Sequence, residues 1–291
     1  TDAQHKDGKN ARQVVRWLED KNYGNKPFFI ALGLQKPHVP FLAPDKYFDP
    51  YPFDKITYKT DRSNLWDFLP QSALSKRYEA FGFNFAKENH ALRKEYMQAY
   101  HACVSFIDAQ LGLVMDSLKK QGLWEDTVIV FTSDHGYHLG DHFIWGKVTL
   151  FDIGAKVPFI VRAPGLSKSG ANSEAMVELI DIYPTLIDLA GLKAPGHLQG
   201  SSLRPLLGHP ERLGKKKYAY SVVTRGPKNL GYALRNQNWR YGKWPDGEEL
   251  YNLRSDPQEK NNLAQKDHVK QRIVEFRKIL AEKQENLANT K

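Results

Sequence analysis

The sequence predicts an α/β protein: a mostly parallel sheet with helices on both faces, followed by a small C-terminal antiparallel sheet with a helix. Three short apolar runs bounded by turn residues, at 28–34, 127–132 and 157–162, are typical of strands buried on both faces. Amphipathic helical patterns alternate with these runs, as expected when helices cover a parallel sheet. The composition changes after about Arg212, where short aromatic strands separated by turn residues begin.

The first elements are a helix and a strand. Ala11, Val14 and Leu18 follow a 3.6-residue period and predict an amphipathic helix over 8–23, which Pro27 ends. The apolar run 28–34 then predicts a strand, and a loop stiffened by prolines follows at 36–41. Residues 42–90 show little periodicity, and a segment of this kind usually forms a functional or surface excursion.

The longest helical pattern covers 95–122 and leads to the second strand, at 127–132. A polar loop, 133–136, follows that strand at once. The third strand is expected at 157–162 and a further helix at 182–192. Ligands of parallel sheets bind outside the carboxyl ends of the strands. The loops that contain His38 and Asp134 both leave such ends, so they are the first places to look for a site.

The C-terminal part is predicted to be a separate α+β subdomain. Strands are expected at 218–223, 232–235, 239–241 and 249–252, with a polar helix over 267–286. We therefore divide the chain into an α/β core at 1–213 and a subdomain at 214–291.

Composition and charge narrow the function classes. With 41% hydrophobic and 26% charged residues the chain is an ordinary globular one, and no apolar run reaches the roughly 18 residues of a membrane span. The net charge of +9 favours anionic partners such as acidic glycans or phosphate esters. The single cysteine, Cys103, lies mid-helix and is expected in the core. The first residue is not Met, so we expect a piece of a longer chain.

The densest cluster of reactive side chains follows the second strand. Asp134 and His135 are adjacent there, and a carboxylate with an imidazole suits a divalent cation. Lys147 would place an ammonium nearby, where it could bind an anionic group or stabilise a leaving oxygen. A solvated turn with a capping aspartate is the alternative.

His38 is the second candidate. Pro37 and Pro40 restrain the backbone on both sides of it, and a catalytic imidazole needs such preorganisation. A purely structural histidine would fit the same pattern, and Lys36 beside it would fit a surface charge.

Several of these runs resemble the type I sulfatases. Residues 132–147, TSDHGYHLGDHFIWGK, resemble the second signature of that family, and residues 28–41, FFIALGLQKPHVPF, are similar to its histidine-bearing loop. Support comes from runs in the family's order at 105–112, 181–186 and 249–257. The KPHVPF loop and the Asp-His pair look most like the iduronate-2-sulfatase group.

The resemblance implies an alkaline phosphatase-like fold and hydrolysis of a sulfate ester of a sugar, a glycosaminoglycan-type glycan or an algal polysaccharide. It makes Asp134 and His135 ligands of one Ca²⁺. It makes His38 and Lys147 catalytic, with His38 as the proton donor to the departing oxygen. The substrate contacts that it implies are Lys36, Tyr137, His138 and His142.

The sequence also departs from the family. It has neither the Cys/Ser-X-Pro-X-Arg motif that yields the formylglycine nucleophile nor the Asp-Asp pair that supplies further metal ligands. Gln35 stands where His is expected, and Phe143 where Gly is usual. We therefore expect the C-terminal portion of a sulfatase, inactive alone, whose N-terminal portion brings the nucleophile and the remaining calcium ligands.

Two other functions stay open. One is a phosphodiesterase or phosphonate hydrolase of the same superfamily, and the other is a non-catalytic glycan-binding remnant. We expect neither nucleic acid nor a membrane as partner. By analogy the protein is periplasmic or secreted, with the single cysteine favouring a bacterial source, or lysosomal if it is eukaryotic.

Overall fold

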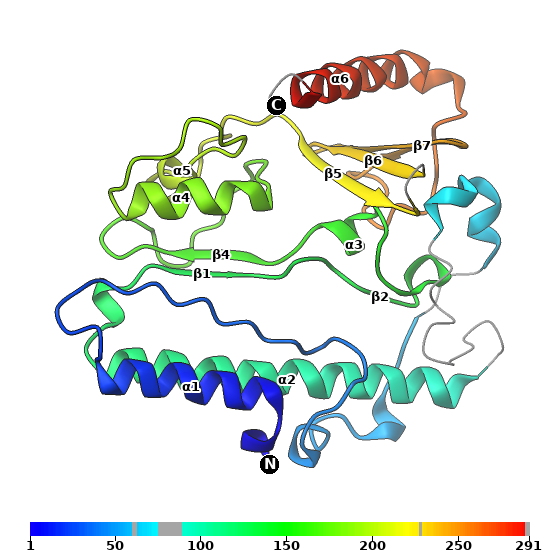
Figure 1. Ribbon diagram of the computed structural model, residues 1–291. Helices are drawn as coiled ribbons and strands as arrows, with labels where there is room; N and C mark the ends of the chain where they lie inside the picture. The colour runs from blue at the N-terminus through cyan, green and yellow to red at the C-terminus, as the bar shows by residue number, and fades with distance from the viewer. Residues whose placement is uncertain (60–62, 75–88, 227–228, 289–291) are drawn as a thin grey trace. The chain divides into compact units, whose positions relative to one another are not determined.

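The computed structural model describes residues 1–59, 63–74, 89–226 and 229–288, which form two compact units (Figure 1). The helical unit comprises Thr1–Lys59 and Asn84–Thr127, and the sheet unit comprises Thr60–Phe83 and Val128–Lys291. The predicted division of the chain at 213/214 stays a prediction.

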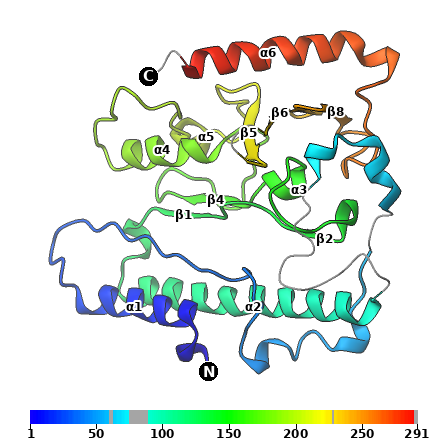
Figure 2. The same ribbon diagram turned by 45° about the vertical axis from the view of Figure 1, so that its right-hand side comes forward.

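Two helices that lie side by side build the helical unit (Figures 1 and 2). Helix α1 (Lys6–Asp20) buries Ala11, Val14 and Leu18, the stripe that predicted it. The 3₁₀ turns of this unit are η1 (Asp2–Gln4), η2 (Asp45–Tyr47), η3 (Phe53–Lys55) and η7 (Trp124–Asp126).

Helix α2 (His90–Lys120) begins five residues before the predicted 95, because Asn89 caps it by accepting a hydrogen bond from the Leu92 amide at 2.9 Å. Its core face includes Cys103, which is fully buried. Burial raises the pKa of the Cys103 thiol to about 11, so this cysteine is the inert core residue that the sequence predicted.

The strand predicted at 28–34 is not formed among the described residues. The segment is extended, and its residues alternate between half-buried and exposed instead of being buried on both faces. Phe29 is 80% exposed. A strand is defined by its ladder to a neighbour, and an apolar run alone cannot supply one.

The sheet unit begins with strand β1 (Ile129–Thr132), which pairs antiparallel with β4 (Phe159–Arg162). The described strands pair only antiparallel, so the mostly parallel sheet that the sequence predicted is not formed among the described residues. The chain between β1 and β4 forms a hairpin of β2 (His138–Leu139) and β3 (Trp145–Gly146) and the short helix α3 (Asp152–Ala155), without the crossover helix that a parallel pair requires. Helices α4 (Ile182–Leu189) and α5 (Arg204–Gly208) lie to one side of β1 and β4 (Figure 2).

The small C-terminal antiparallel sheet that the sequence predicted is formed, and its four strands follow the order β5-β6-β7-β8. Helix α6 (Lys270–Ala288) covers one face of it (Figure 1). Ile273, Phe276 and Leu280 of α6 pack with Tyr241 and Leu250 of the sheet. The strands are β5 (Ala219–Thr224), β6 (Leu230–Arg235), β7 (Trp239–Trp244) and β8 (Gly247–Asn252), and the 3₁₀ turns of the unit are η4 (Ser63–Phe68), η5 (Gln71–Ala73), η8 (Asp141–Phe143), η9 (Leu179–Asp181) and η10 (Asp267–Val269).

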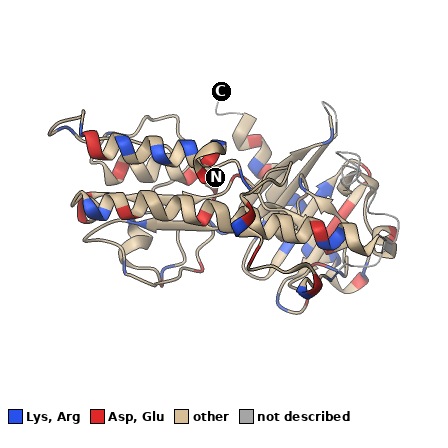
Figure 3. Ribbon diagram, turned by 90° about the horizontal axis from the view of Figure 1, so that it is seen from below, with Lys and Arg blue, Asp and Glu red and all other residues tan. Residues whose placement is uncertain are grey.

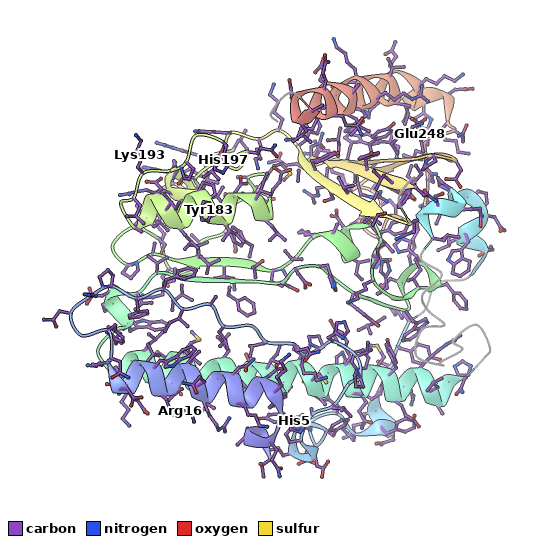
Figure 4. The ribbon with its side chains drawn as sticks, in the orientation of Figure 1. His5, Arg16, Tyr183, Lys193, His197 and Glu248 are labelled. Carbon is purple, nitrogen blue, oxygen red and sulfur yellow. The ribbon has the colours of Figure 1, made fainter. Side chains whose placement is uncertain are left out.

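The Glu248 carboxylate of β8, labelled in Figure 4, joins this sheet to α6. It accepts hydrogen bonds from Arg277 Nε at 2.7 Å and from the Tyr241 hydroxyl at 2.6 Å. The Arg277 hydrogen bond is the main cause that lowers the pKa of Glu248 from 4.5 to about 2. A lowered pKa in the fold means stabilisation that is complete above pH 4.5 and is lost as the pH falls towards 2.

Replacing Glu248 by Gln is therefore expected to lower the free energy of unfolding at pH 7 by about 1–2 kcal/mol, a value reduced for the solvent exposure of Arg277. The difference between wild type and variant should shrink between pH 7 and pH 3, as measured by urea denaturation. An equal difference at both pH values would show that the carboxylate charge contributes nothing.

None of the described helices combines the length and the apolar character needed to cross a bilayer. Basic and acidic residues are interspersed along the helices in the view of Figure 3.

Candidate functional site

The polar turn after β1 consists of Asp134, His135 and Gly136. The Asp134 side chain is 85% exposed and that of His135 is 36% exposed. Asp134 Oδ1 accepts a hydrogen bond from the His135 amide at 3.0 Å, and the Ser133 hydroxyl donates to the His135 carbonyl oxygen at 2.9 Å. These local bonds make both side chains project from the same turn.

The His135 ring is oriented for ligand binding. Nδ1 donates to the Gly136 carbonyl oxygen at 2.8 Å, which leaves the lone pair of the neutral ring on Nε2. Nε2 lies 3.4 Å from Asp134 Oδ2, so one cation could contact both atoms. Calcium takes about six to eight ligands, mostly oxygens, and no cluster of three or more His, Cys, Asp or Glu suited to a metal occurs in the described part of the chain. This pair alone does not complete a calcium site.

Gly136 is held against α3. Its amide donates to the Gly154 carbonyl oxygen at 3.0 Å. A Cβ atom at Gly136 would lie 2.0 Å from the Ile153 carbonyl oxygen, so only glycine allows this approach. Helix α3 therefore determines where the Asp134–His135 turn sits within the sheet unit.

Lys147 and Tyr137 are both half-buried in the same loop region. Lys147 follows β3 directly, and within the described residues its ammonium group has no hydrogen bond or ion pair. A half-buried lysine without a counter-ion is suited to an anionic ligand.

His138 and His142 occupy a different environment. His138 is fully buried, with Nδ1 near the Asp141 carbonyl oxygen at 3.0 Å and Nε2 near the Thr149 hydroxyl at 2.7 Å. His142 is 3% exposed, stacks on Phe151 with ring centroids 3.9 Å apart, and donates from Nε2 to the Glu259 carbonyl oxygen at 3.1 Å. Their burial favours support of the loop from inside and weighs against the substrate contacts that the resemblance implied.

Phe143 has a φ of 56°, in the left-handed region. This explains why a glycine is usual at the position, since a Cβ atom is unfavourable in that conformation. The Phe143 ring packs edge-on against Trp66, with centroids 5.9 Å apart. That contact offsets part of the backbone cost.

The second candidate loop belongs to the helical unit. His38 is exposed, and its Nδ1 donates to the Val39 carbonyl oxygen at 2.7 Å, so Nε2 is the ring nitrogen that this bond does not occupy. Lys36 Nζ donates to the carbonyl oxygens of His38 at 3.1 Å and Pro40 at 2.5 Å, so its ammonium closes the loop. The peptide bonds before Pro37 and Pro40 are cis.

A buried carboxylate that sequence reasoning missed fastens this loop to α1. Asp7 is 2% exposed, and its two oxygens accept hydrogen bonds from the amides of Gln35 at 2.8 Å and Lys36 at 2.9 Å. Because the partners are backbone amides 28 and 29 residues away, no side-chain pattern could have revealed it.

Replacing Asp7 by Ala is expected to lower the free energy of unfolding by about 1–3 kcal/mol, because two backbone amides lose the buried carboxylate that accepts their hydrogen bonds. Asp7→Asn keeps one acceptor oxygen and should cost less. Urea denaturation of both variants checks the order. Equal stability of Asp7→Ala and wild type would show that water replaces the carboxylate without cost.

The chain matches known proteins along most of its length. The sulfatase family model matches residues 2–192, and the model of the C-terminal part of N-sulphoglucosamine sulphohydrolase matches residues 140–286. A sulfatase of Formosa agariphila is 37% identical over 275 residues, covering 92% of this chain and 52% of that protein. Iduronate 2-sulfatase of Mus musculus is 28% identical, covering 88% of this chain and 61% of that protein.

Solved structures share the fold. A protein in complex with its substrate D-glucosamine-2-N,6-O-disulfate superposes with a TM-score of 0.83 at 23% identity, covering 98% of this chain and 70% of that one. The phosphonate monoester hydrolase of Silicibacter pomeroyi superposes with a TM-score of 0.85 at 25% identity, covering 98% of this chain and 61% of that one. The alkaline phosphatase-like α/β fold expected from the sequence is confirmed by these similarities.

The chain spans about half the length of the relatives that it matches. The two family models together cover residues 2–286, and they overlap at 140–192, a range that includes Lys147. The chain therefore belongs to the sulfatase family.

Proposed function

We propose that the protein to which this chain contributes hydrolyses a sulfate ester of an anionic saccharide. The observation that carries the proposal is the turn after β1, in which Asp134 Oδ2 and His135 Nε2 lie 3.4 Å apart. The related protein solved with a disulfated glucosamine supports a sulfated sugar as the substrate class.

Residues of two loops, the one that contains Lys147 and the one that contains His38, would take part in the reaction. Lys147, whose ammonium lacks a partner among the described residues, would bind an anionic oxygen of the sulfate. His38, in its doubly protonated form, would give its Nε2 proton to the sugar oxygen as the S–O bond breaks, while its Nδ1–H keeps the hydrogen bond to the Val39 carbonyl oxygen. Tyr137 and Lys36 remain proposed substrate contacts. Lys36 would contribute chiefly by closing the His38 loop.

Asp134 and His135 would hold one edge of a Ca²⁺ ion whose charge offsets that of the sulfate. The remaining ligands and the formylglycine nucleophile would come from an N-terminal portion of the same protein, since the sequence has neither motif. Exposed apolar side chains support such a portion. Phe29 in the unpaired extended segment is 80% exposed, and Ile160 on β4 is 60% exposed.

By analogy with sulfatases, we propose a periplasmic or secreted location in a bacterium, or a lysosomal one in a eukaryote.

Phosphonate ester hydrolysis is the second candidate function. The structural similarity to a phosphonate monoester hydrolase favours it.

The test uses the complete gene product and compares an aryl sulfate, sulfated monosaccharides and an aryl phosphonate monoester. We expect kcat/KM for the sulfate esters to exceed that for the phosphonate ester by at least about ten-fold. Removal of calcium with a chelator should abolish turnover, and Asp134→Asn should weaken calcium binding. A preference for the phosphonate ester would establish the second candidate, and glycan binding without turnover would establish a non-catalytic remnant.

A further inference from the structure

Glu259 is a buried carboxylate just beyond the C-terminal sheet that the proposed chemistry does not use. It is 2% exposed, and its φ of 55° lies in the left-handed region, which is unfavourable for a residue with a side chain. A glycine would relieve that cost. The side chain must therefore contribute interactions that offset it.

The contacts of Glu259 reach the loop that contains the candidate site. Oε2 accepts a hydrogen bond from the Asp152 amide, at the start of α3, at 2.6 Å. The backbone carbonyl oxygen accepts one from His142 Nε2 at 3.1 Å. The sequence separations are 107 and 117 residues, so one residue ties together two points of the loop that are distant from it in the chain.

Helix α3 transmits this attachment to the turn. It is four residues long, begins at Asp152, and provides at Gly154 the carbonyl oxygen that accepts the Gly136 amide at 3.0 Å. Only two residues thus separate Asp152, whose amide donates to Glu259, from Gly154, whose carbonyl oxygen accepts from Gly136. Gly136 packs too closely on Ile153 to move independently of α3.

We propose that Glu259 is a positioning residue for the Asp134–His135 turn. It fixes α3 and the β2–β3 hairpin, and thereby the direction in which the Asp134 carboxylate and His135 Nε2 point. The inference rests on the proposed function only for the statement that this turn binds a ligand. The hydrogen bonds that connect Glu259 through α3 to the turn do not depend on that function.

Arg240 supplies the charge that allows the carboxylate to be buried. It is 1% exposed, lies over the rings of Phe151 at 4.9 Å and Tyr251 at 4.6 Å, and donates from Nε to Glu259 Oε1. Its Nη1 donates to Glu249 Oε2 at 2.7 Å. Glu249 is 1% exposed, shares the same guanidinium and forms no hydrogen bond to the loop within the described residues, which makes it a matched control.

The experiment measures hydrogen exchange by mass spectrometry in the complete protein, without metal or substrate, for Glu259→Gln and Glu249→Gln. A glutamine at 259 has one acceptor oxygen and cannot serve both Arg240 and the Asp152 amide. We expect exchange in peptides spanning 133–137 and 150–155 to accelerate about ten-fold or more in Glu259→Gln, relative to peptides of β6 and β7. In Glu249→Gln the exchange rates of these peptides, relative to those of β6 and β7, should stay near the wild-type values.

Equal acceleration in both variants, or acceleration of all peptides together, would reduce the role of Glu259 to general stability and overturn the proposal. Should Glu259→Gln fail to fold, the reciprocal variant Gly136→Ala decides. Its Cβ would push the turn off Ile153, so exchange should accelerate at 150–155, and no change there would also overturn the proposal. Because no sulfate ester enters this test, its failure is distinguishable from failure of the proposed function.

Discussion

Replacing Arg240 by Ala is expected to lower the free energy of unfolding by about 3–5 kcal/mol. The guanidinium is 1% exposed and lies between the Glu249 and Glu259 carboxylates, which are 1% and 2% exposed. Burial alone would lower the pKa of Arg240, and the two carboxylates raise it above its usual value. Removing the cation leaves two buried acids that must either take up protons or draw in water. Urea denaturation at pH 7 measures the loss.

Arg277→Ala is the control for this prediction. Arg277 pairs with Glu248 but is 56% exposed, so its removal should cost no more than about 1 kcal/mol. An Arg240→Ala variant as stable as Arg277→Ala would mean that the buried network is hydrated and that its charges are not desolvated.

Elements with a strong local pattern could be predicted from the sequence. The apolar stripe of Ala11, Val14 and Leu18 predicts its helix from neighbouring residues alone. The turn residues between the C-terminal strands predict the antiparallel sheet in the same local way. Strand pairing could not be predicted in the same way. The run 28–34 has the composition of a buried strand, but a ladder depends on a neighbour that composition does not reveal, and β1 and β4 have the same kind of sequence whether parallel or antiparallel.

The candidate site shows the same limit at the level of single residues. His135 and His138 are the same residue type three positions apart. Yet the His135 ring is partly exposed beside the Asp134 carboxylate, whereas the His138 ring is buried between Asp141 and Thr149. Asp7 and Glu259 were missed because each carboxylate accepts a hydrogen bond from a backbone amide that is far away in the sequence. Such bonds depend on tertiary structure and have no sequence signature.

Replacing His38 by Ala is expected to reduce kcat/KM for a sulfated sugar by about 10²–10⁴-fold in the complete enzyme. The leaving group of a sulfated sugar is an alcohol oxygen, which departs slowly unless it receives a proton. The loss should be much smaller for an aryl sulfate with an acidic phenol, because its phenolate leaves without protonation. Comparing both substrates with both enzymes measures the contribution of the proton donor alone.

Lys36→Ala provides the matched control within the same loop. Lys36 holds the carbonyl oxygens of His38 and Pro40, so its loss should displace the loop and lower activity towards both substrates by a similar factor. If His38→Ala also lowers both activities equally, His38 binds the sulfate instead of protonating the leaving group. The ratio of the two substrate effects, and not the size of either, therefore distinguishes an acid from a binding residue at this position.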